Sequence, residues 1–114
     1  MAYTGTPLVR NQMLLLPADP PRRIRLDTAA WRRWLETADA FRYLAPHSVY
    51  PLTVRKEKRR HGWYWYAYLK SDAKLHNAYV GRSEAVTTAR LGQVLQTLLA
   101  KVRRHTQQQQ PKEG

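Results

Sequence analysis

The sequence contains no cysteine and few acidic residues. Without cysteine, neither a disulfide framework nor a thiolate zinc site can form. The longest run of aliphatic residues is Met13 to Leu16, far shorter than the roughly 20 residues of a membrane-spanning helix. The first ten residues lack the charged, apolar and small segments of a signal peptide. We therefore expect a soluble, cytoplasmic protein without a membrane partner.

Glycine is also scarce, and the five glycines are isolated, so no glycine-rich loop could cradle a phosphate group. The four histidines are scattered, with no pair at the spacing of a helical metal site. The eight carboxylates show no spacing typical of acid–base catalysis. We expect no catalytic residue, no metal and no cofactor, and thus a protein that is not an enzyme.

Positive charge, in contrast, is abundant. Twenty Lys and Arg against eight Asp and Glu give a formal net charge of +12 on 114 residues. The cations cluster in three groups, within residues 22–33, 55–60 and 101–104. So much unbalanced charge favours a polyanionic partner, and nucleic acid is the commonest one for a small basic domain.

The pattern of apolar residues predicts one α+β domain over residues 22–105. Residues 1–21 should be irregular, because four prolines interrupt them, although residues 12–16 and 22–26 could form short strands. Apolar stripes predict helices over about 28–38 and 88–104. Asp27 or Thr28 can cap the first helix, and Thr87 or Thr88 the second. Residues 106–114, with four consecutive glutamines, should be a disordered tail.

Alternating residues predict three strands between these helices, over about 49–59, 63–70 and 74–80. His61-Gly62 and Ser71-Asp72-Ala73 are typical turn sequences. The expected fold is a three-stranded antiparallel sheet packed on the C-terminal amphipathic helix, with an additional N-terminal helix.

The central strand has two different faces. One carries Trp63, Trp65, Ala67 and Leu69, which we assign to the core. The other carries Tyr64, Tyr66, Tyr68 and Lys70, an amphipathic row whose hydroxyls can stay in water. This row is either exposed for binding or packed under the N-terminal helix.

Residues 62–91, GWYWYAYLKSDAKLHNAYVGRSEAVTTARL, resemble a segment near the N-terminus of bacterial LuxR/MalT-like ATP-dependent transcriptional regulators, and of small stand-alone bacterial proteins. The upstream stretches RLDTAAWRRWLETADAFRY and LTVRKEKRRHGWYW resemble the corresponding lead-in, so that the likeness covers about residues 24–95. Leu69 and the glycine-free turn after it depart from this pattern. More distantly, three strands followed by a helix resemble the arm-type, AP2-like DNA-binding domain of tyrosine recombinases.

This resemblance implies that the sheet lies in the major groove of duplex DNA, in transcription or in a mobile element. From the residue types, Arg55 suits guanine, whereas Lys70 and Lys74 suit phosphates. The candidate nucleic-acid contacts are Thr53, Arg55, Arg59, Arg60, Tyr64, Tyr66, Tyr68, Lys70, Lys74, His76 and Arg82. Two alternatives remain: stacking of single-stranded DNA or RNA on the tyrosines, and a protein–protein adaptor that uses the Trp and Tyr surface.

Overall fold

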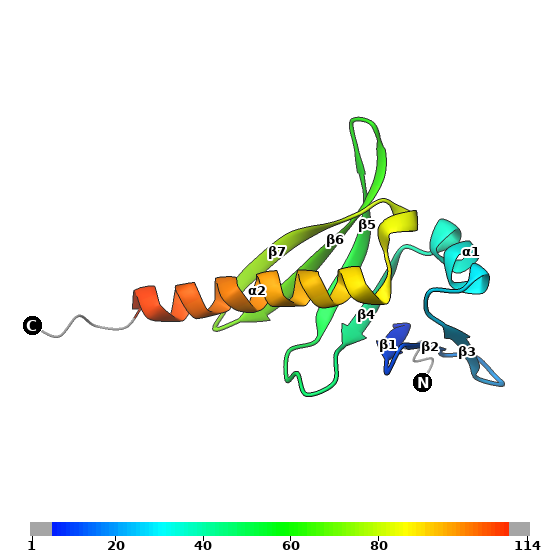
Figure 1. The fold of residues 1–114 in the computed structure, drawn as a ribbon, viewed down its shortest axis with the longest axis horizontal. Helices are drawn as coiled ribbons and strands as arrows, with labels where there is room; N and C mark the ends of the chain where they lie inside the picture. Colours follow the sequence, from blue (N-terminus) through cyan, green and yellow to red (C-terminus); the bar gives the residue numbers. More distant parts are fainter. Residues whose placement is uncertain (1–5, 110–114) are drawn as a thin grey trace, which may run out of the picture.

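A computed structural model describes residues 6–109 as one mixed sheet with two helices on one of its faces (Figure 1). The sheet order is β3-β2-β1-β4-β5-β6-β7, and all neighbours are antiparallel except β1 and β4. The elements are β1 (Leu8–Arg10), β2 (Met13–Leu16), β3 (Arg22–Arg25), α1 (Ala29–Thr37), β4 (Ala40–Leu44), β5 (Leu52–Arg59), β6 (Gly62–Ser71), β7 (Lys74–Gly81), the 3-10 turn η1 (Ser83–Ala85) and α2 (Thr88–Gln109).

The predicted three-stranded antiparallel fold is wrong, because β5, β6 and β7 form only one end of a seven-stranded mixed sheet. Residues 1–21 were expected to be irregular apart from a possible strand over residues 12–16, yet β1 and β2 form a hairpin between Pro7 and Pro17. The prolines flank these strands instead of interrupting them. The possible strand corresponds to β2, whereas the three residues of β1 leave too short an alternation to be recognised in sequence.

Both helices lie where their apolar stripes predicted them. Thr28 caps α1, since its hydroxyl accepts a hydrogen bond from the Trp31 amide at 3.2 Å. Thr87 caps α2 in the same way through the Arg90 amide at 3.1 Å. Asp27 instead accepts from the Thr88 amide at 3.0 Å, so that the loop after β3 holds the start of α2. Helix α2 continues to Gln109, past the predicted tail boundary at residue 106; residues 110–114 lie outside the described residues.

The core lies between the two helices and one face of the sheet. Every strand contributes alternate side chains to it, among them Val9, Leu14, Phe41, Val54 and Leu69. An aromatic cluster joins α1 to the sheet: the Trp31 and Trp34 rings pack on Phe41, and Phe41 packs on Trp65 at 5.5 Å between centroids. Since α1 packs on the Trp65 side, the tyrosine row on the other side is not covered by it.

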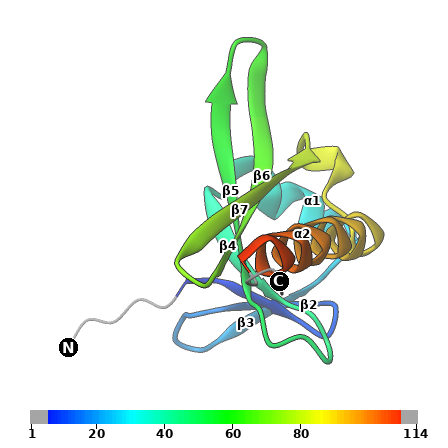
Figure 2. The same ribbon diagram turned by 90° about the vertical axis from the view of Figure 1, so that its left-hand side faces the viewer.

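The hairpin of β5 and β6 extends past the rest of the sheet (Figure 2). Pairing with β4 ends at Arg55, and pairing with β7 ends at Trp65. Residues 57–64 therefore form a free two-stranded ribbon, which we call the arm. Trp63 lies in the arm and is 55% exposed, so its assignment to the core was wrong. The register puts Trp63 on the same side as Trp65, where it lines a hollow next to the end of α1 instead of entering the core.

Candidate nucleic-acid interface

The uncovered face of the sheet is built by the register of β5, β6 and β7. Arg55 lies opposite Tyr66, which lies opposite Tyr79. The side chains of paired residues project from the same face of a sheet, and so does the side chain of every second residue along a strand. The face therefore carries Thr53, Arg55, Tyr64, Tyr66, Tyr68, Lys70, Asn77 and Tyr79. All of these side chains are partly or fully exposed.

Each tyrosine of β6 has an arginine over its ring. The guanidinium carbon of Arg55 lies 5.8 Å from the Tyr68 centroid, and that of Arg59 lies 4.6 Å from the Tyr66 centroid. Arg82, in the loop after β7, lies 5.0 Å from the Tyr64 centroid. We call these three pairs the Tyr–Arg ladder.

Hydrogen bonds fix two of these pairs further. Arg59 Nε donates to the Tyr66 hydroxyl at 3.3 Å, and Arg82 Nη2 donates to the Tyr64 hydroxyl at 3.1 Å. Arg82 Nη2 also reaches the His61 carbonyl at 3.4 Å, which ties the loop after β7 to the tip of the arm. Cation–π contact and hydrogen bonding together hold the guanidinium groups in one orientation.

Glu57 is the acidic residue of this face, and it is engaged on both sides. Its carboxylate pairs with Arg59 at 2.5 Å and accepts a hydrogen bond from the Tyr68 hydroxyl. Burial raises the pKa of Tyr68, and the hydrogen bond and charge of Glu57 raise it further. Glu57 therefore orders the ladder while cancelling only part of its charge.

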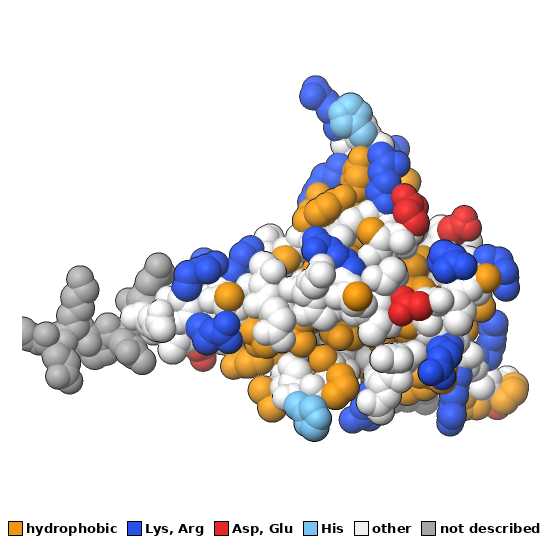
Figure 3. Space-filling model, in the orientation of Figure 1, with side chains coloured by type: hydrophobic (Ala, Val, Ile, Leu, Met, Phe, Trp, Pro, Cys, Tyr) orange, Lys and Arg blue, Asp and Glu red, His pale blue; other side chains and the backbone are white. Residues whose placement is uncertain are grey.

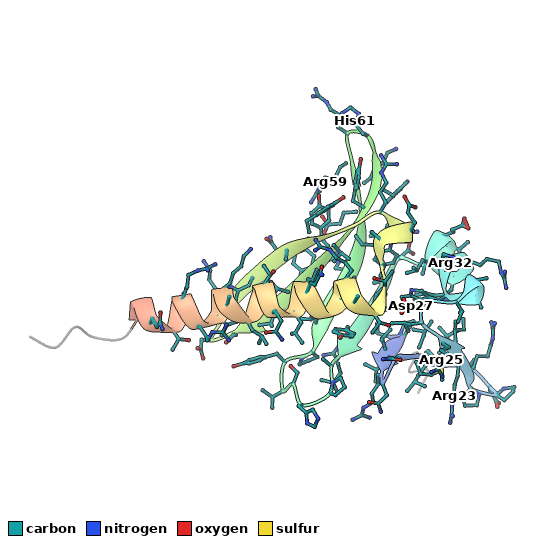
Figure 4. The ribbon with its side chains drawn as sticks, viewed as in Figure 1. Arg23, Arg25, Asp27, Arg32, Arg59 and His61 are labelled. Atoms are coloured by element: carbon teal, nitrogen blue, oxygen red, sulfur yellow. The ribbon has the colours of Figure 1, made fainter. Side chains whose placement is uncertain are left out.

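Further arginines lie on the same face toward β3. Arg42 of β4 lies opposite Thr53, and Arg10 of β1 lies next to Leu44. Arg23 and Arg25 of β3, labelled in Figure 4, continue the face through β2. None of these four arginines was among the candidate contacts. The alternation in β4, with Phe41 and Tyr43 buried around an exposed Arg42, was the signal that could have shown Arg42.

Most predicted contacts lie together on this face, but three do not. Arg60 lies in the turn at the arm tip. His76 pairs with Leu69 on the helix side and is 6% exposed, while Lys74 pairs with Ser71 on that same side. The tight turn at Asp72-Ala73 sets this register, which the sequence did not reveal.

His76 packs in an apolar and cationic environment between β7 and α2. Its ring centroid lies 5.7 Å from that of His105. Within the described part of the chain, its Nε2 is buried without a hydrogen-bond partner. Burial lowers the pKa of His76, and the nearby positive charges of His105, Lys74 and Lys101 lower it further. This histidine is suited to packing against α2, not to contacting a ligand on the uncovered face.

The three groups of basic residues do not converge on one surface. Figure 3 shows Lys and Arg side chains along the arm, around the β3–α1 end and along α2. Several basic side chains bond the protein's own backbone: Lys56 bonds the end of α1, Arg90 bonds the Val80 and Tyr79 carbonyls, and Lys101 bonds the Asn77 carbonyl. Net charge thus overstates the number of cations free to meet a ligand.

Comparison with known proteins finds no matching family model, no similar curated protein and no similar solved structure. The resemblance to the transcriptional regulators and to the arm-type domain therefore stays a prediction. Neither helix within residues 6–109 has a stretch long and apolar enough to cross a membrane. In the same part of the chain, no three His, Asp or Glu side chains converge as metal ligands would.

Proposed function

We propose that this chain binds nucleic acid, and duplex DNA in preference to single strands, through the uncovered face of its sheet. The observation that carries the proposal is the Tyr–Arg ladder. An arginine held over a tyrosine ring can offer its remaining N–H groups to phosphate oxygens or to the guanine O6 and N7 atoms. Holding arginines in place before binding lowers the entropy lost on association.

The same geometry argues against base stacking as the main mode of binding. Stacking of unpaired bases needs free aromatic faces. The rings of Tyr64, Tyr66 and Tyr68 each have one face covered by an arginine. Tyr64 and Tyr66 also contact Tyr79, at 6.1 and 5.5 Å between centroids. The ladder therefore favours charged contacts with a backbone and with base edges.

A salt series with duplex DNA, single-stranded DNA and RNA tests this proposal. Duplex affinity should fall linearly on logarithmic axes as salt increases, because bound counterions are released. Replacing Arg55 and Lys70 by glutamine should lower the slope by about two, since each lost phosphate contact removes about 0.9. Tryptophan fluorescence in urea confirms that the variant is folded.

The matched control replaces Arg103 and Arg104, two exposed arginines of α2 on the helix side, by glutamine. It removes the same charge and should leave the slope unchanged. Absence of binding to all three nucleic acids at low salt would contradict the proposal and favour a protein partner. Equal losses in both variants would mean that net charge, and not this face, determines affinity.

A further inference from the structure

The arm is a separate structural unit with cations on both of its faces. Residues 57–64 pair only with one another, and at about 3.3 Å per residue the ribbon extends roughly 13 Å beyond the sheet. Arg59 lies on the ladder side, Lys58 on the opposite side, and Arg60 and His61 in the turn between. Figure 2 shows that neither helix covers this tip, and Figure 4 labels Arg59 and His61 on the arm.

The side of the arm opposite the ladder carries an aromatic–cation pair of its own. Trp63 is 55% exposed, although indole is among the costliest groups to leave in water. Lys58 Nζ lies 6.0 Å from the Trp63 ring. Trp63 lines the hollow next to the end of α1 and is not part of the core. The side of the arm opposite the ladder therefore offers an exposed aromatic and a cation to a ligand.

Acidic side chains gather at the base of the arm. A hollow of about 430 Å³ lies there, lined by the carboxylates of Glu36, Asp39 and Glu84. Lys56 and Arg82 line the same hollow and offset part of this negative charge. The outer part of the arm is thus more strongly cationic than its base, so a phosphate backbone would be attracted mainly to the outer part.

We propose that the arm enters the major groove of duplex DNA, with the Tyr–Arg ladder toward one wall of the groove and Lys58 with Trp63 toward the other. This inference rests on the proposed function. The major groove, about 12 Å wide, admits a two-stranded β-ribbon, whereas the minor groove, about 6 Å wide, is too narrow for one with side chains on both faces. The three carboxylates at the base favour contact with the outer part of the arm.

The experiment measures binding of the full chain to a 24-base-pair duplex across a salt series. The test variant replaces Lys58 by glutamine and Trp63 by threonine, two exposed side chains outside the core. We expect at least a tenfold loss of affinity and a decrease of about one in the salt slope. The control Arg104→Gln removes the same charge from α2 and should bind as the unchanged chain does.

Two further measurements identify the groove. Duplex should protect Trp63 from quenching by acrylamide, so the protection should disappear in Trp63→Phe. Methyl green, which occupies the major groove, should compete with the protein, whereas netropsin in the minor groove should not. If the Arg55 and Lys70 variant loses affinity while the Lys58 and Trp63 variant does not, the arm inference is wrong and the proposed function stands. Competition by netropsin alone would also overturn it. If the unchanged chain binds no duplex, the proposed function itself fails.

Discussion

Lys56 allows a sharp test of how the sheet and α1 are joined. Its ammonium donates to the carbonyls of Leu35 at 2.7 Å and Glu36 at 3.0 Å, at the end of α1. The preceding carbonyl, that of Trp34, already accepts from the Ala38 amide at 3.0 Å. Lys56 therefore satisfies the carbonyls that a helix end leaves free, and its charge suits the negative end of the helix dipole.

Lys56→Met removes the ammonium and retains most of the alkyl chain. A hydrogen bond from a charged donor contributes about 1.5–3 kcal/mol. Lys56 is only partly buried, and water can reach the two carbonyls once the ammonium is gone. We therefore expect a loss of about 2 kcal/mol in the free energy of unfolding, not the sum of two full bonds. For a chain of 114 residues, this corresponds to a Tm lower by about 8 °C.

Lys58→Met is the matched control. Lys58 has the same side chain, two residues further along the same face of β5, but it lies in the arm and is exposed. Urea unfolding followed by tryptophan fluorescence should show the loss for Lys56→Met and almost none for Lys58→Met. Duplex binding, in contrast, should be weakened by Lys58→Met and almost unchanged by Lys56→Met. Equal unfolding midpoints for the two variants would refute the assignment of Lys56 to the end of α1.

Two further predictions concern pH and turn geometry. The pKa of His76 is lower in the folded chain than in the unfolded chain, so the unfolded state binds the proton first as pH falls. The contribution of His76 to the free energy of unfolding should thus be fully present above about pH 6.5 and decrease below it. The urea midpoints at pH 7.5 and 5.5 should differ less in His76→Phe than in the unchanged chain. The control His61→Gln, at an exposed position, should behave as the unchanged chain does. Ala73 has a φ of +62°, which costs an alanine about 1–2 kcal/mol. Ala73→Gly should stabilise by about 0.5 kcal/mol after the extra chain entropy of glycine, while Ala100→Gly inside α2 should destabilise by about 1 kcal/mol; a loss at both positions would contradict the turn assignment.

Elements with a long, regular pattern were the predictable part of the fold. The apolar stripe of α2 and the alternation in β6 repeat often enough to be recognised locally. The tyrosine side of β6 was likewise readable, since alternation alone separates Tyr66 from Trp65. Strands β1 and β4 have three and five residues, and their pairing joins distant segments, such as Val9 with Tyr43. A local sequence pattern does not show which distant strands pair with each other.

For the candidate site, the sequence indicated which residues to choose, but it did not show which side chains contact one another. Arg55 and the β6 tyrosines could be chosen from their alternation. The arginine over each ring could not, because Arg82 reaches Tyr64 from 18 residues further along the chain. The register of β7 decided the placement of His76, and the same alternation shifted by one residue would have exposed it.

The sequence by itself determined a strongly basic chain without cysteine, with one aromatic strand and one long amphipathic helix, because composition and periodicity are local properties. The tertiary structure alone decided which basic residues remain available. Lys56, Arg90 and Lys101 bond backbone carbonyls away from the uncovered face, whereas Arg55, Arg59 and Arg82 lie over tyrosine rings on that face. The physical reason is that a cation's partner is set by distance in space, and sheet register and helix packing bring that partner from remote parts of the chain.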